Sequence, residues 1–173
     1  MFSFSALIYE KDGSLTVEIM DDIVTTFHQD PHPHVVMYHP DLLRIKRYLF
    51  TEICCQLNEY VHELDKDHFF SSLLSKFQHH ILDIHLHTRT DHGHSSTTEI
   101  HDTTLISKRK PIIQRLAFVW FLHDYDGILL FGNHAVQPKK GKLILYPLSW
   151  CIPVVESISK TQEVLTLRGT IGW

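Results

Sequence analysis

The sequence lacks the features of several common protein classes. It has no uninterrupted apolar run of the roughly 18 residues that a membrane-spanning helix needs. Its first residues, MFSFSALIYEKDG, have neither the basic start nor the apolar core of a signal peptide. The formal net charge is −4, without the basic footprint of a nucleic-acid-binding protein. We therefore expect a soluble, intracellular (cytoplasmic) protein that binds neither nucleic acid nor membranes.

Glycine and cysteine are also scarce, which excludes further chemistries. The seven glycines form no phosphate-binding loop and no Rossmann fingerprint. The three cysteines contain no C-x-x-C pair for structural zinc and form no disulfide framework. Cys54 and Cys55 lie in a helical apolar pattern, where we expect buried and inert thiols. A chain of 173 residues is expected to be one domain, long enough to bury a core without such links.

Histidine, by contrast, is abundant. The chain has 15 histidines, and seven of them fall between His79 and His101. Imidazole is the commonest metal ligand and titrates near neutral pH, so such a cluster is compatible with a metal site or a pH response. A high local number of histidines does not by itself bring their side chains together around one metal. A polar loop rich in histidine is the simpler interpretation.

The first forty residues predict extended structure. Phe4–Tyr9 and Ser14–Met20 alternate apolar and polar residues on either side of Lys11-Asp12-Gly13, which predicts a β-hairpin with Asp-Gly in its turn. A short strand is predicted around Val35–Tyr38, within a segment rich in proline and histidine.

Helices are predicted next along the chain. Apolar residues recur at helical spacing from Leu42 to Leu64, and Pro40 suits the first turn of such a helix. A second helix is predicted from a cap at Asp67 to Ile81. The alternation in Ile81–Thr88 then predicts a strand.

The last third of the chain predicts short strands separated by turn residues. The apolar runs are Arg115–Leu122, Ile128–Phe131, Lys142–Pro147 and Glu163–Trp173. In the last run, alternation puts Leu165 and Leu167 on one face of the strand and Thr166 and Arg168 on the other. Helices followed by a run of strands favour an α+β domain in which helices brace one face of a β-sandwich.

The succession RLAFVWFL, DYDGILLF, PKKGKLILYP and TIGW resembles the C-terminal half of the 2-oxoglutarate/Fe(II)-dependent dioxygenases of the prolyl-4-hydroxylase type. The resemblance spans Pro111 to Trp173. It implies a double-stranded β-helix, or jelly roll, braced by two N-terminal helices. It also implies an oxidoreductase (hydroxylase) with Fe(II) and 2-oxoglutarate as cofactors if the site is intact.

The resemblance implies an H-x-D pair of iron ligands ahead of the first of these strands. His101 stands at the position of the histidine, but Thr103 stands where the aspartate is expected, and Asp102 lies one residue early. A slip of one residue on a strand turns a side chain to the opposite face. Asp102 could therefore bind iron only if the backbone bulged there.

The other two positions implied by the family lie near the C-terminus. The distal histidine ligand is expected at Val154 or Val155, and no histidine follows His134. Arg168 is the best match for the basic residue that pairs with the far carboxylate of 2-oxoglutarate. Glu156 is the nearest carboxylate that could replace the missing ligand.

Two further metal patterns are present. His92, His94 and Glu99 match the first cupin motif, H-x-H-(x)4-E, in which three ligands converge on one metal. The only literal H-x-D, His28-Gln29-Asp30, lies far ahead of the strands and is expected to be a solvated loop.

Two classes of function stay open. The first is an Fe(II)/2-oxoglutarate hydroxylase with relocated ligands, or a cupin-type metal-binding protein. The second is a non-catalytic descendant of the fold that acts as a binding scaffold, with no bound cofactor. The missing distal histidine favours loss of the ordinary activity.

Overall fold

The computed structural model describes residues 7–64, 80–89, 95–97, 104–106, 111–148, 154–158 and 164–172. The helices are α1 (Val17–Gln29), α2 (Val35–Tyr38), the 3-10 helix η2 (Pro40–Leu42) and α3 (Leu43–Leu64). The strands are β1 (Tyr9–Lys11), β2 (His80–Arg89), β3 (Ser95–Thr97), β4 (Thr104–Ile106), β5 (Pro111–Phe121), β6 (Gly127–Phe131), β7 (His134–Val136), β8 (Leu143–Pro147), β9 (Val154–Ile158) and β10 (Val164–Gly172).

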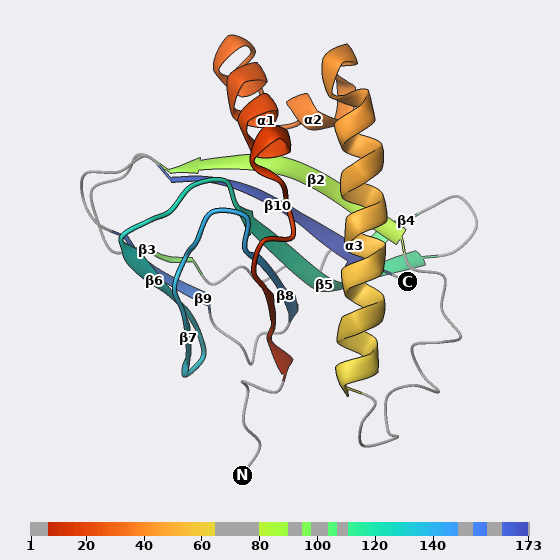
Figure 1. The fold of residues 1–173 in the computed structure, drawn as a ribbon. Helices are drawn as coiled ribbons and strands as arrows, with labels where there is room; N and C mark the ends of the chain where they lie inside the picture. The colour runs from red at the N-terminus through yellow and green to blue at the C-terminus, as the bar shows by residue number, and fades with distance from the viewer. Residues whose placement is uncertain are drawn as a thin grey trace.

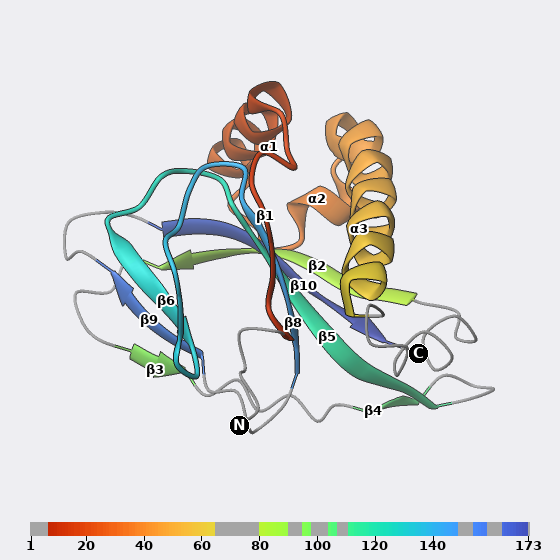
Figure 2. The same ribbon diagram turned by 60° about the horizontal axis from the view of Figure 1, so that its bottom comes forward.

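The strands form two antiparallel sheets. The larger has six strands in the order β1-β8-β5-β10-β2, with β4 paired to β5, and the smaller has the order β3-β9-β6-β7. The helices α1, α2 and α3 all lie on one face of the larger sheet (Figures 1 and 2), and the smaller sheet lies on the other side. The predicted combination of helices with an antiparallel sheet is confirmed.

Alternation along the strands of the larger sheet creates two cores. On β5, Phe118 and Trp120 pack against the helices, whereas Val119 and Phe121 face the smaller sheet. The helix-facing core adds one apolar stripe from α1 and one from α3: Met20, Ile23, Phe27, Ile45, Leu49, Ile53 and Leu57. The core between the sheets draws on both of them: Ala117, Val119, Phe121, Ile144, Tyr146, Leu129, Phe131 and Val136.

The long helix and the main strands were predictable. The helix expected near Pro40 is present as η2 followed by α3. The strand expected at Ile81–Thr88 is β2, and the four strands expected in the last third correspond to β5, β6, β8 and β10. The segment from Asp67 to His79, where a second helix was predicted, lies outside the described residues. None of the helices in the described ranges is long and apolar enough to cross a membrane.

The predicted N-terminal hairpin is wrong. β1 pairs with β8, with Tyr9 opposite Leu145, and the chain enters α1 at Val17. Leu15, Val17 and Ile19 alternate in the sequence, but Val17 is 54% exposed. The buried side chains of α1 instead recur at helical spacing, at Met20, Ile23, Thr26 and Phe27. Thr16 starts the helix, because its side chain accepts a hydrogen bond from the Ile19 N–H at 3.4 Å.

The strand predicted around Val35–Tyr38 is also wrong, because this segment is the short helix α2. Val35 and Val36 bury their side chains in the helix-facing core. The backbone just before the helix takes the place next to β2, where the Leu86 N–H donates to the Pro33 carbonyl at 2.7 Å. A β-branched pair therefore packs well here without forming a strand.

A tight turn joins the N-terminal segment to the larger sheet. Gly141 has φ +79°, and its N–H donates to the Phe121 carbonyl at 2.8 Å. Its own carbonyl accepts from the N–H and the hydroxyl of Ser14, at 3.0 and 3.2 Å. The same hydroxyl oxygen accepts from the indole N–H of Trp120 at 2.6 Å. Ser14 thus satisfies the polar atom of a side chain that is otherwise wholly in the core.

Candidate functional site

Arg168 lies in the interior of the protein. It belongs to β10, which runs between β5 and β2 in the larger sheet. Leu165 and Leu167 pack in the helix-facing core. Arg168 lies on the opposite face of β10, is only 7% exposed, and is paired with Val119, whose side chain lies in the core between the sheets. The predicted alternation along this strand is confirmed.

The neighbouring edge strand adds two imidazoles to the same face. On β2, His85 is paired with Arg168, and His87 is paired with Thr166. Residues directly opposite each other in an antiparallel pair point to the same side of the sheet. Leu86, between the two histidines, packs in the helix-facing core, as this alternation requires. The inner face therefore carries a polar group of four side chains: His85, His87, Thr166 and Arg168.

Hydrogen bonding orients the guanidinium. Arg168 Nε donates to Thr166 Oγ1 at 3.0 Å, which holds the side chain along its own strand. A guanidinium offers several further N–H groups in a planar fork. Its surroundings include the apolar core between the sheets, where Phe131 and Tyr146 pack with ring centroids 4.8 Å apart. Electrostatic attraction is stronger in such a medium than in water, so this face is suited to bind a carboxylate.

The connection between α1 and α2 covers the edge of this polar group. The His34 ring lies 5.9 Å from the His85 ring, and the His32 ring lies 5.9 Å from that of His34. The Leu86–Pro33 hydrogen bond fixes the connection along β2. His85 and His87 were not predicted as site residues from the sequence. Their alternation with the apolar residues of β2 is the signal that could have found them.

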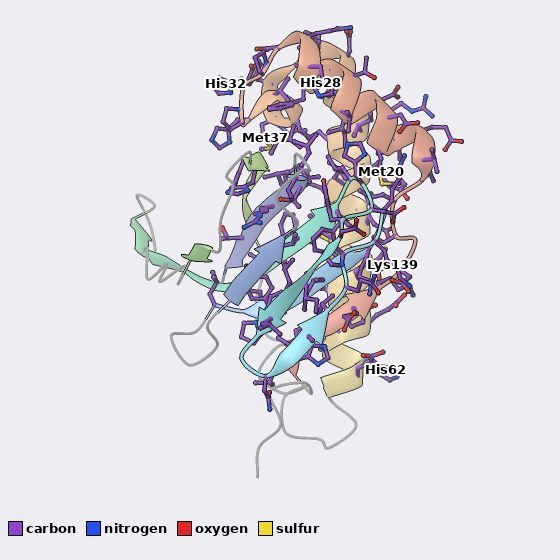
Figure 3. All side chains as sticks on the ribbon, turned by 90° about the vertical axis from the view of Figure 1, so that its left-hand side faces the viewer. Met20, His28, His32, Met37, His62 and Lys139 are labelled. Atoms are coloured by element: carbon purple, nitrogen blue, oxygen red, sulfur yellow. The ribbon has the colours of Figure 1, made fainter. Side chains whose placement is uncertain are left out.

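The literal H-x-D is not a metal site. His28 is exposed in the last turn of α1, not in the loop expected for it, and lies at the outer end of the helical layer (Figure 3). The Asp30 carboxylate accepts a hydrogen bond from the Tyr38 hydroxyl at 2.7 Å. This hydrogen bond raises the pKa of Tyr38 to about 12. Asp30 is thus part of a surface contact between α1 and α2.

The thiols of α3 are not buried, contrary to expectation. Cys54 and Cys55 are both exposed, because the face of α3 that packs on the sheet carries Ile53 and Leu57. Partial burial, with Cys55 nearby, raises the pKa of the Cys54 thiol. Cys54 is therefore a poor thiolate nucleophile at neutral pH, as an inert thiol would be.

The remaining predicted metal ligands lie outside the described residues. These are His101 and Asp102, with the alternative set His92, His94 and Glu99, and they stay predictions. Within the described part of the chain, no three histidine, cysteine, aspartate or glutamate side chains converge to hold a metal.

The position predicted for the distal iron ligand lies on β9. Val154 and Val155 belong to β9, where they are paired with Phe131 and Leu130 of β6. A valine side chain has no donor atom. Neither residue can supply the distal iron ligand that the resemblance predicts at this position, and the other predicted ligands, His101 and Asp102, lie outside the described residues.

Comparisons with known proteins connect this geometry to a fold. No protein-family sequence model matches the chain, and no curated protein sequence matches it. Solved structures do match along nearly the whole chain. A viral collagen prolyl hydroxylase from Paramecium Bursaria Chlorella virus-1, solved as a 2-oxoglutarate complex, matches with a TM-score of 0.64 and 12% identity, over 96% of each chain.

Two further matches come from bacteria. A prolyl-4-hydroxylase from Pseudomonas putida has a TM-score of 0.60 and 11% identity, over 98% of this chain and 99% of its own. HygX from Streptomyces hygroscopicus, with nickel and 2-oxoglutarate bound, has a TM-score of 0.62 and 11% identity, over 96% of this chain and 81% of its own. The chain therefore has the fold of the prolyl-4-hydroxylase-like 2-oxoglutarate/Fe(II) oxygenases.

Proposed function

We propose that this protein binds a small dicarboxylic acid of the 2-oxoglutarate class between its two sheets, with Arg168 as the carboxylate anchor. In this proposal the two sheets form the jelly roll of the dioxygenases, and the iron site is altered or lost. The observation that carries the proposal is the position of Arg168, buried and directed between the sheets from the central part of β10.

Burial of a guanidinium is costly unless anions or hydrogen-bond acceptors surround it. Thr166 accepts from one nitrogen, and the fork geometry of the terminal nitrogens suits a carboxylate that binds through both oxygens. A lysine at this position would carry the same charge without the planar fork. The choice of arginine therefore supports recognition of a carboxylate rather than a general need for positive charge.

The imidazoles of β2 support the same class of ligand. His85 is opposite Arg168 in the sheet, and His87 is opposite the threonine that orients it. Imidazole N–H groups can donate to carboxylate oxygens in either protonation state. An acid with two carboxylates could thus be held by Arg168 at one end and by polar groups along the inner face.

These residues support a site for an acid, but they do not support the iron site that the resemblance implies. Valine at the expected distal position removes one ligand of the triad, and Asp102 is out of register with the expected H-x-D. We therefore assign acid binding to this protein and no hydroxylation step. A binding role, with the dioxygenase fold serving as a scaffold, is the function that these residues support best.

Isothermal titration calorimetry with 2-oxoglutarate tests the proposal. The wild-type protein should bind the acid, and Arg168→Ala should reduce the affinity at least about tenfold, as expected for loss of a charge-assisted hydrogen bond. Arg168→Lys should restore only part of it. Arg47→Ala, which removes an exposed arginine of α3, is the matched control and should bind like the wild type.

Competition defines the class of ligand. Succinate should compete with 2-oxoglutarate, whereas acetate, with one carboxylate, should compete poorly. Circular dichroism of each variant distinguishes loss of a ligand contact from loss of the fold. A wild-type protein that shows no heat of binding, and no shift in melting temperature with 2-oxoglutarate, would overturn the proposal.

A further inference from the structure

A row of basic side chains leads from the edge of the larger sheet to its inner face. Arg168 on β10 is opposite His85 on the edge strand β2. The His34 ring, on the connection between α1 and α2, lies 5.9 Å from the His85 ring. Exposure increases along this row, because Arg168 is buried, His85 is partly buried and His34 is exposed. The row therefore connects solvent with the guanidinium that anchors the acid in the proposed function.

The connection between α1 and α2 holds His34 in place. Pro31 and Pro33 fix the backbone on either side of His32. The Pro33 carbonyl accepts a hydrogen bond from the Leu86 N–H at 2.7 Å. The His34 N–H donates to His32 Nδ1 at 3.1 Å, and the His34 side chain makes no capping hydrogen bond to α2, which begins at the next residue. The connection therefore positions the His34 ring beside β2 without using it as a helix cap.

The groups around this pair of imidazoles are mostly basic. The titratable or charged side chains that the structure describes next to the pair are His32, Tyr38, Asp30, His87 and Arg168. The carboxylate of this set, Asp30, accepts a hydrogen bond from the Tyr38 hydroxyl at 2.7 Å. Imidazole titrates near neutral pH, so protonation of the pair adds positive charge beside the guanidinium. An anion bound at the pair would offset the resulting repulsion.

We propose that His34 and His85 form the subsite for the second carboxylate of the acid whose first carboxylate binds Arg168. Each imidazole donates one N–H to this carboxylate, and protonation strengthens both hydrogen bonds. Neighbouring strands lie about 4.8 Å apart, a span that the three methylene carbons of glutarate bridge and the single carbon of malonate does not. The pair therefore selects dicarboxylic acids of glutarate length. The proposal rests on the Arg168 anchor of the proposed function, and it makes the α1–α2 connection part of the binding site.

Truncation of the ligand tests which residues contact the second carboxylate. The probes are glutarate, measured by isothermal titration calorimetry, and butyrate, which is glutarate without one carboxylate, measured by its displacement of glutarate. His34→Ala and His85→Ala should each weaken glutarate binding about threefold to tenfold, as expected for loss of a hydrogen bond to a charged group. The same variants should change the affinity for butyrate less than about twofold, whereas Arg168→Ala should weaken both acids. Malonate should bind the wild type less tightly than glutarate, and this difference should shrink in His34→Ala.

The pH dependence of the affinity supplies a second readout. The carboxylates of glutarate stay ionised between pH 6 and pH 8, whereas imidazole takes up a proton in this range. A group that binds more protons in the complex than in the unbound protein makes binding tighter as the pH falls. The wild type should therefore bind glutarate about tenfold more tightly at pH 6 than at pH 8, and butyrate less than about threefold more tightly. The double variant His34→Ala/His85→Ala should lose the gain for glutarate.

Matched variants separate contact with the ligand from damage to the fold. His62→Ala removes an exposed histidine at the C-terminal end of α3, far from His32 in Figure 3, and should bind glutarate like the wild type. His34→Asn keeps an N–H donor that cannot take up a proton. It should retain part of the affinity at pH 8 and lose the gain at pH 6, and it serves as the readout if an alanine variant fails to fold by circular dichroism.

Three results would overturn the proposal, and they separate it from the role of Arg168. Equal affinity for glutarate in the wild type and in folded His34→Ala and His85→Ala, with weaker binding by Arg168→Ala, would remove the subsite and leave the anchor. Equal losses for glutarate and butyrate in the histidine variants would show that the imidazoles only support the fold around Arg168. A wild type that binds neither 2-oxoglutarate nor glutarate would overturn the anchor and the subsite together.

Discussion

Removal of the Ser14 hydroxyl should destabilise the protein, because it leaves the buried indole N–H of Trp120 without its hydrogen-bond acceptor. Trp120 is fully buried, and its indole N–H donates to Ser14 Oγ at 2.6 Å. Ser14→Ala leaves that donor in the core without its acceptor, and Ser14 itself is only 7% exposed, so water does not readily replace the hydroxyl. An unsatisfied buried donor costs about 1–3 kcal/mol. We expect a loss of about 2 kcal/mol, or about 4–8 °C in melting temperature for a chain of this length.

Urea denaturation followed by tryptophan fluorescence measures this loss, and a double-mutant cycle assigns it. In a Trp120→Phe background the indole N–H is gone, so Ser14→Ala should cost about 1–2 kcal/mol less than in the wild type. Thr25→Ala removes an exposed hydroxyl from α1 and should change stability by less than about 0.5 kcal/mol. An equal cost of Ser14→Ala in both backgrounds would refute the role of the indole hydrogen bond.

Two further substitutions test other buried or paired polar groups. Tyr125→Phe should cost about 1–3 kcal/mol in urea denaturation, because the buried Tyr125 hydroxyl bonds both the N–H and the carbonyl of Leu165 at 2.6 Å; an unchanged midpoint would contradict this. Burial alone would raise the pKa of Glu10, but hydrogen bonds from Lys142 and His134 outweigh it and hold the pKa below the ordinary value of 4.5. The stabilisation from ionised Glu10 is therefore present above pH 4.5 and lost as the pH falls through the lower folded-state value. The wild type should lose its stability advantage over Glu10→Gln across that acid range, and a difference independent of pH would count against the pairing.

The sequence predicted those parts of the fold whose apolar spacing has a single interpretation. The stripe on α3 extends over many turns, and the runs around β5, β8 and β10 are bounded by turn residues. The segment after Ser14 was misassigned because its first residues alternate like a strand, whereas the helical period shows only when Ile23 and Phe27 are included. The capping hydrogen bond of Thr16, which starts the helix, was not considered.

The candidate site could also be predicted only in part from the sequence. The face of β10 that carries Arg168 could be predicted from alternation alone, since Leu165 and Leu167 occupy the other face. His85 and His87 were overlooked because histidine is so frequent in this part of the chain that its spacing carries little information. Their importance follows from the pairing of β2 with β10, which is a contact between residues far apart in the sequence.

We propose that the dioxygenase fold of this chain keeps an anchor for an acid without the family's iron triad. Calorimetric titration of 2-oxoglutarate with and without Mn(II), in the wild type and in Arg168→Ala, tests it most directly. We predict binding by the wild type that changes less than about threefold when Mn(II) is omitted and that weakens at least about tenfold in Arg168→Ala. Binding that requires Mn(II) and survives Arg168→Ala would show a working metal centre and contradict the claim.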